Sequence, residues 1–105
     1  MDKPGREDAL ALLQKARDDA HVVMRLVDDP GAALWTVGFH AQQAVEKSIK
    51  AVLANAGIAY PFVHDLEALI KLLRQSGIPT PPDAETLPRL TAFAALLRYE
   101  DDDDS

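Results

Sequence analysis

Apolar and polar residues alternate along this chain with the period of a helix. Over residues 37–52, apolar or small residues recur every three or four positions, as they do on one side of an amphipathic helix. The residues of this apolar stripe are Val37, Ala41, Ala44, Val45, Ser48, Ile49 and Val52. The segment 39–53 contains no proline or glycine. We therefore expect a helix from about Ala33 to Asn55 with this stripe as its apolar side.

The polar side of the same helix carries an unusual second stripe. His40, Gln43, Lys47 and Lys50 fall at helical intervals, with Gln42 and Glu46 beside them. Two interpretations of the lysines are open: they contact phosphate, or they face solvent and pair with Gln43 and Glu46. A solvent-exposed pair of the second kind stabilises a helix by only about 0.3–0.5 kcal/mol, too little to explain why so many polar residues are grouped here.

A first long helix is predicted from about Arg6 to Val27. Its core-facing stripe comprises Leu13, Ala16, Ala20, Val23 and Val27, and its solvent side comprises Asp8, Lys15, Asp18, Asp19 and Arg25. The segment 28–31 (Asp-Asp-Pro-Gly) ends this helix, because proline and glycine favour a turn. Gly38, Ala41, Val45 and Ser48 are small enough for another backbone to approach closely, either the first helix or a second subunit.

Two shorter helices follow. Asp65 is a good N-cap for a helix over 66–75, whose buried face comprises Leu66, Leu69, Ile70 and Leu73. The proline-rich stretch 78–82 predicts an extended linker. The last helix begins within 84–88 and continues to about Arg98. The predicted fold is all-α: an up-and-down antiparallel bundle of about four helices.

Composition and charge place limits on the organisation of the chain. Its 105 residues are enough for one domain. We expect a flexible N-terminus over 1–5, a helical domain over 6–99 and a disordered acidic tail over 100–105, since adjacent like charges repel. The net charge is −6, of which Glu100–Asp104 carry five. The remainder is nearly neutral, so the overall acidity does not identify a partner.

Several classes of site and location are excluded or disfavoured. The absence of cysteine excludes disulfides, thiolate zinc sites and a cysteine nucleophile, and it is compatible with the cytoplasm, where we place the protein. The N-terminus has no signal-peptide core, and no apolar run approaches the ~18 residues of a membrane span. His21, His40 and His64 are far apart in sequence, so we expect neither a metal site nor a cofactor.

The amino-acid sequence of the predicted central helix resembles that of the HEPN family of small helical bacterial and archaeal proteins. The matching features are Phe39-His40-Ala41-Gln42-Gln43-Ala44-x-Glu46-Lys47-x-x-Lys50, then Tyr60-Pro61, then His64-Asp65-Leu66, and finally Arg98-Tyr99. These motifs occur in the family's order and extend the resemblance over about residues 6–99.

The resemblance implies a helical bundle that commonly forms a two-fold homodimer. Many family members are encoded beside a minimal nucleotidyltransferase and form a toxin–antitoxin pair with it. Many catalytic members are metal-independent ribonucleases in which an arginine is followed four to six residues later by a histidine. An imidazole titrates near neutral pH and can move the 2′-hydroxyl proton, while a guanidinium stabilises the phosphate.

This chain departs from that catalytic pattern. Arg98 matches the family's arginine, but the positions that should hold a histidine are occupied by Asp102–Asp104. Arg17 is followed by His21 at the required spacing, but that pair lies in the first helix, and we interpret it as surface residues. Catalysis is therefore doubtful, and any activity would be that of a metal-independent endoribonuclease.

The candidate site residues have two interpretations each. The residues proposed to bind nucleotide or RNA are His40, Gln43, Lys47, Lys50, His64 and Tyr99, and Arg98 is the candidate catalytic residue. The alternatives are that His40 packs at a helix contact, that His64 braces the start of the third helix, and that Arg98 complements a helix dipole. Trp35, the only tryptophan, is expected to anchor the core or a dimer contact.

Three functional hypotheses follow. The first is a HEPN subunit of a toxin–antitoxin-type pair that dimerises, pairs with a minimal nucleotidyltransferase and binds nucleotide or RNA without cleaving it. The second is an active endoribonuclease toxin, and the third is a helical dimer scaffold without a ligand.

Overall fold

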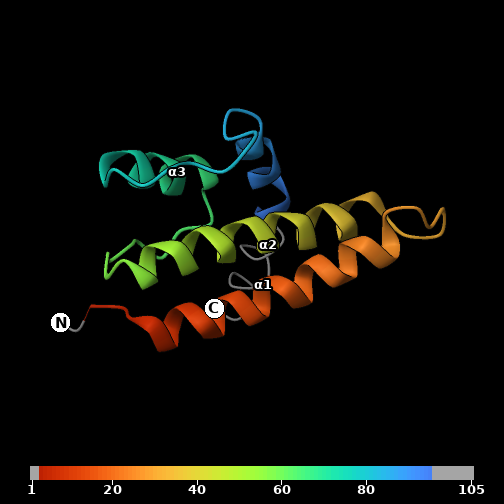
Figure 1. Cartoon of the computed structure of the whole chain (residues 1–105). Helices are drawn as coiled ribbons and strands as arrows, with labels where there is room; N and C mark the ends of the chain where they lie inside the picture. The colour runs from red at the N-terminus through yellow and green to blue at the C-terminus, as the bar shows by residue number, and fades with distance from the viewer. Residues whose placement is uncertain (1–2, 96–105) are drawn as a thin grey trace, which may run out of the picture.

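The computed structural model describes residues 3–95, and within them the chain is all-α, as predicted. The helices are α1 (Arg6–Leu26), α2 (Leu34–Asn55), α3 (Leu66–Gln75) and the 3-10 helix η1 (Leu87–Ala94). α1 and α2 form a long antiparallel hairpin, and α3 and η1 pack on the other side of α2 (Figure 1). In this part of the chain, no helix is long and apolar enough to cross a membrane.

The ends of the three α-helices lie within one residue of the predicted ends, because local signals define them. The Asp65 side chain accepts a hydrogen bond from the Glu67 N–H and caps α3, as expected. Gly57 and Gly77 follow the last turns of α2 and α3 with φ angles of +72° and +71°. Such left-handed residues let the next N–H groups bond back to the final helical carbonyls, which ends each helix.

The fourth element differs from the prediction. An α-helix was expected from about 84–88 onward, but residues 87–94 form a 3-10 helix with Pro88 in its first turn. Its Phe93 ring lies against Gly38 of α2, and its Thr91 hydroxyl accepts a hydrogen bond from the Leu66 N–H at 3.1 Å. η1 therefore joins α2 to the start of α3. Leu97 and Arg98, the predicted end of this element, lie outside the described residues.

The apolar core lies between α2 and α3. The predicted inward face of α3 is confirmed, and it packs on two residues of α2. The core residues are Ile49, Leu53, Leu66, Leu69, Ile70 and Leu73. On α1, Ala16 is buried as expected, but Val27 is exposed, because the predicted stripe continues past the end of the helix.

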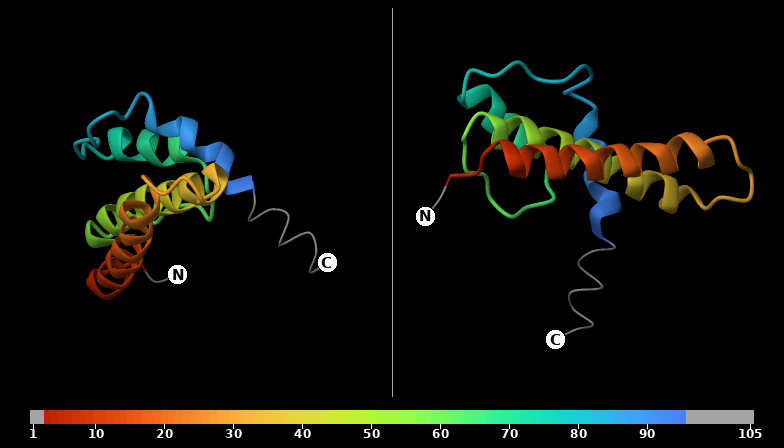
Figure 2. Two further views of the ribbon diagram at one scale, coloured as in Figure 1. Left: turned by 90° about the vertical axis from the view of Figure 1, so that its right-hand side faces the viewer. Right: turned by 60° about the horizontal axis from the view of Figure 1, so that its bottom comes forward.

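The two sides of α2 are covered in an unexpected way. An apolar side is normally the buried one, but here Ser48 and Val52 of the predicted apolar stripe are exposed and most of its other residues are only half-buried. The polar side instead packs against α1 and the 58–65 connection. Trp35 is 57% exposed, so the first of its two predicted places, the core, is wrong, and the second, a dimer contact, stays a prediction. Figure 2 (left) shows α2 between α1 on one side and α3 and η1 on the other.

Candidate functional site

The polar stripe of α2 lies inside the molecule. Gln43 and Lys50 are 7% and 8% exposed, and Gln42 and Glu46 beside them are also buried. The interpretation of the lysines as solvent-facing is therefore wrong for Lys50. Burying polar groups costs free energy unless they are hydrogen-bonded, and every buried side-chain polar atom in the described part of the chain has a partner.

One cluster joins α1 to α2. The Asp19 carboxylate of α1 contacts His40 Nδ1 at 2.8 Å through one oxygen and Lys47 Nζ at 2.6 Å through the other. We call these three residues the Asp19 cluster. Asp19 was predicted to face solvent, but it is only 8% exposed. It lies three residues after Ala16 and so on the same helical face, which is the signal that could have placed it correctly.

A second cluster joins α2 to the connection that precedes α3. The Glu46 carboxylate contacts Lys50 Nζ at 3.0 Å through one oxygen and His64 Nδ1 at 3.0 Å through the other. Gln42 donates both to Glu46 at 2.9 Å and to the His64 carbonyl at 3.0 Å. Gln43 donates to the Gln42 side-chain oxygen at 2.7 Å. These five residues form the Glu46 cluster.

The partners of Glu46 keep it ionised. Burial by itself would raise the pKa of this carboxyl group. Hydrogen bonds from Gln42, Lys50 and His64, together with the positive charge of Lys50, outweigh that effect and lower the pKa below its ordinary value. Tyr60 covers the same lysine, with Lys50 Nζ 5.7 Å from the centre of its ring. Burial, followed by the Asp8 carboxylate, raises the pKa of the Tyr60 hydroxyl.

The two clusters contain the same three kinds of charged or titratable side chain. Each holds a carboxylate, a lysine and a histidine, and the carboxylate lies between the other two. Lys47 and Lys50 are therefore neutralised within the protein, which weakens the case for either as a phosphate ligand. The histidines are the most accessible members, with side chains 29% exposed for His40 and 37% for His64. Both are held through Nδ1, which directs a further partner to Nε2.

The structure brings the predicted residues together only in part. His40 joins Lys47 through Asp19, while Gln43, Lys50 and His64 belong to the Glu46 cluster. His40 does pack at a helix contact, as one interpretation held. Lys50 does pair with Glu46, but this pair lies inside the protein. Lys47 bonds to Asp19 instead, and among the described contacts it makes no hydrogen bond to Gln43. Arg98 and Tyr99 lie outside the described residues.

The pair that matches the catalytic spacing belongs to neither cluster. Arg17 and His21, which match the catalytic spacing, are both exposed on α1. Among residues 3–95, no group of three or more possible ligands could hold a metal ion.

Comparison with known proteins agrees with the all-α fold. The family model described as HEPN domain matches residues 9–105. No curated protein and no solved structure gives a significant match. The family match covers most of the chain and includes α2 with its two clusters, so the chain belongs to the HEPN domain family.

Proposed function

We propose that this protein is the non-catalytic HEPN component of a toxin–antitoxin-type pair, and that it works by binding a minimal nucleotidyltransferase. The observation that carries the proposal is the internal pairing of the motif's charges. Asp19 and Glu46 neutralise Lys47 and Lys50. A site that stabilises the charge developing on a phosphate needs cations directed at the phosphate, and these two lysines are directed elsewhere.

Nucleotide or RNA recognition enters the proposal through the histidines. His40 and His64 are the partly exposed members of the two clusters, and each is oriented by a carboxylate on Nδ1. A neutral imidazole held in this way can accept a hydrogen bond at Nε2, and a protonated one can donate to phosphate.

A second candidate function is metal-independent RNA cleavage. The pairing of a histidine with a carboxylate, 2.8 Å apart in His40–Asp19 and 3.0 Å apart in His64–Glu46, favours it. Such a carboxylate orients an imidazole so that it can serve as a general base.

The decisive experiment combines binding and cleavage. The purified chain is mixed with a minimal nucleotidyltransferase encoded beside its gene, and separately with a fluorescent mixed-sequence RNA in EDTA. We expect a stable protein complex and no RNA cleavage. Cleavage that is lost in His40→Gln or His64→Gln, but retained in the exposed control His21→Gln, would establish the second candidate and refute the first.

The absence of both complex and cleavage would contradict both candidates and leave the scaffold hypothesis. Cleavage lost only in Arg98→Ala would show that the family arginine acts without its usual histidine. Cleavage lost only when Arg17 and His21 are both changed to alanine would show that the pair on α1 is the catalytic one.

A further inference from the structure

The connection between α2 and α3 turns one aromatic side chain outward. Phe62 is 99% exposed, more than any other large apolar residue on the surface of the described chain. Its apolar neighbours face the other way, because Ile58, Tyr60 and Val63 pack against the core. The 58–65 connection is therefore anchored in the fold and yet holds a phenylalanine ring in solvent.

Neither the core nor the chemistry of turns accounts for a phenylalanine at this position. The Val63 N–H donates to the Pro61 carbonyl at 2.9 Å, so Phe62 is the central residue of a three-residue turn. Turns favour glycine, proline, asparagine, aspartate and serine, each for a physical reason that phenylalanine does not share. Keeping an apolar ring in water is also unfavourable. A ring placed in this way is suited to contact with another molecule.

Both ends of this turn are fixed to α2. Before the turn, the Ile58 N–H donates to the Leu53 carbonyl at 2.9 Å. After the turn, the His64 side chain contacts Glu46 at 3.0 Å, and the His64 carbonyl accepts a hydrogen bond from Gln42 at 3.0 Å. A segment that is held in one conformation loses less entropy when it binds a partner. The Glu46 cluster thus holds in place the segment that carries the exposed ring.

The charges around Phe62 are acidic. Within five positions of it in the sequence, the only aspartate, glutamate, lysine or arginine side chains are those of Asp65 and Glu67, and both are exposed. Burial and then the Asp8 carboxylate raise the pKa of the Tyr60 hydroxyl, so a third acidic group acts on this connection. An acidic surface repels the phosphates of nucleic acids and of anionic lipids, whereas it attracts a protein surface that carries lysine or arginine.

We propose that Phe62 is the anchor of this chain's contact with its protein partner, and that its ring enters an apolar pocket whose rim carries lysine or arginine. This surface deepens the proposed function, on which it rests, since the partner there is a minimal nucleotidyltransferase. Aromatic residues that fill a partner's pocket supply much of the binding free energy of an interface. Charges at the rim mainly increase the rate of association, so the ring and the rim can be tested separately.

The first test removes the ring. Calorimetry measures the binding of the full-length wild type and its variants to the nucleotidyltransferase encoded beside the gene. We expect the dissociation constant to rise by about thirtyfold or more in Phe62→Ala, as is typical of an anchor residue, and by less in Phe62→Leu, which keeps part of the apolar contact. Because Phe62 is almost fully exposed, neither variant should change the urea midpoint, so the loss of affinity reports the contact and not the fold.

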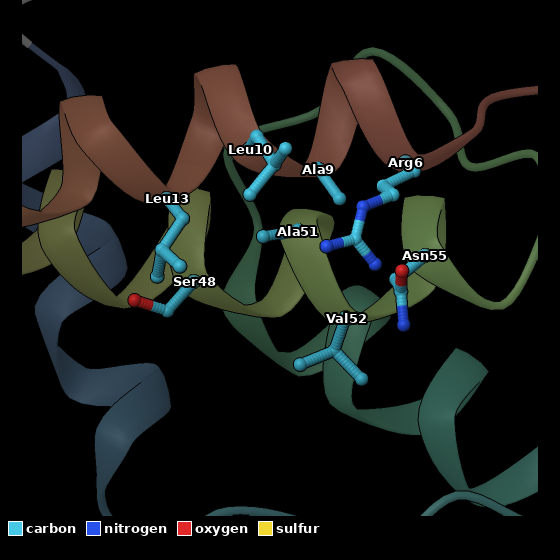
Figure 3. Close-up of a pocket in the computed structure, with 8 residues that line it drawn as sticks. All are labelled: Arg6, Ala9, Leu10, Leu13, Ser48, Ala51, Val52 and Asn55. Carbon is cyan, nitrogen blue, oxygen red and sulfur yellow. The ribbon is translucent and has the colours of Figure 1, made fainter.

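Val52 supplies a control on another surface. It is also an exposed apolar residue, and it lines a pocket between α1 and α2 (Figure 3). It lies two residues after Lys50 and so on the opposite side of the helix. Alanine is a good helix former, so Val52→Ala should fold, and we expect its dissociation constant to change by less than about threefold. An effect of Val52→Ala as large as that of Phe62→Ala would overturn the inference.

The second test changes the charge beside the ring. Glu67→Lys reverses one charge near Phe62, and Asp28→Lys makes the same change at an exposed position between α1 and α2. At about 0.05 M NaCl, we expect the association rate constant to fall by about tenfold in Glu67→Lys and by less than about twofold in Asp28→Lys. The difference should shrink at about 0.5 M NaCl, because salt screens charges. Equal rates for the two variants would overturn the basic rim assigned to the partner.

The outcomes separate this inference from the proposed function. A wild type that forms no complex with the nucleotidyltransferase would refute the proposed function, and the inference would fall with it. A complex that is equally tight in the wild type and Phe62→Ala would overturn the inference alone. If Phe62→Ala instead lost affinity only for a fluorescent mixed-sequence RNA, the ring would stack on a base, which also overturns the inference. A complex weakened by Phe62→Ala and not by Val52→Ala would support both proposals.

Discussion

Gly38 illustrates how one residue joins two distant parts of this fold. A glycine within a helix costs about 1 kcal/mol relative to alanine, so its presence inside α2, four residues after the first residue Leu34, needs a reason. The reason is Phe93 of η1, whose ring occupies the space where a Cβ atom at position 38 would stand. The missing side chain lets an aromatic ring pack directly on the backbone of α2 and hold η1 there.

Replacing Gly38 with alanine should therefore destabilise the protein. The added methyl group overlaps the Phe93 ring, and such overpacking costs about 1–3 kcal/mol. The gain in helix propensity is only about 1 kcal/mol, so the net effect is a loss of stability over most of that range. We expect a lower urea midpoint for Gly38→Ala, and recovery when Phe93 is also changed to leucine. Gly5→Ala, where no atom lies within 4 Å of the new methyl group, serves as the control. An unchanged midpoint in Gly38→Ala would contradict this account of the contact.

Glu46 makes stability depend on pH in a definite direction. In the unfolded chain this carboxyl group takes up a proton near its ordinary pKa of about 4.5, whereas in the folded protein its pKa is lower. Between these two pKa values the unfolded state binds more protons than the folded state does. The stabilisation from Glu46 is therefore complete above about pH 4.5 and is lost as the pH falls through the folded value.

Urea unfolding of the wild type and of Glu46→Gln between about pH 7 and pH 3 measures this effect. The wild type should be the more stable at neutral pH, because the variant leaves Lys50 buried without its carboxylate. The difference in the free energy of unfolding between the wild type and Glu46→Gln should become smaller as the pH falls below about 4.5. A difference in the free energy of unfolding that stays constant with pH for Glu46→Gln would contradict the prediction.

At the scale of elements, the predictable features are those that depend on neighbouring residues. Asp65, Gly57 and Gly77 mark helix ends by local chemistry, and the predicted ends agree with the structure. The inward side of α2 was not predictable in this way, because periodicity shows which residues share a side but not which side another element covers. The Asp19–Lys47 contact joins residues 28 positions apart, and no spacing rule indicates such a pair. The contacts of η1 with Gly38 and Leu66 likewise join residues far apart in the sequence.

The contact between η1 and α3 leads to a prediction for Thr91. Its hydroxyl accepts a hydrogen bond from the Leu66 N–H, one of the backbone donors that the first turn of a helix leaves without a helical partner. Thr91→Val keeps the shape but removes the acceptor, so we expect a loss of about 1 kcal/mol in the free energy of unfolding. Thr91→Ser, which keeps the hydroxyl, should lose less. Equal losses in both variants would show that the methyl group matters more than the hydrogen bond.

At the scale of the whole molecule, the polar side of α2 is buried and much of its apolar side is not, which is the reverse of the usual arrangement. Two sets of paired charges hold α1 and the 58–65 connection to this helix, while half-buried or exposed alanine, serine and valine residues lie on its opposite side. Residues 37–52 could be recognised as amphipathic from the sequence. That the apolar side is the less covered one depends on how four separate segments pack around the helix.

The exposure of Trp35 determines what optical spectroscopy can report about this protein. It is the only tryptophan, and it lies in the first turn of α2, at the end of the hairpin opposite the N-terminus of α1 (Figure 2, right). Its emission should therefore resemble that of an indole in water even in the native state, and acrylamide should quench it readily. Fluorescence will therefore change little when the hairpin end frays and will also miss events between α2 and α3, whose packing has to be monitored by circular dichroism or amide exchange.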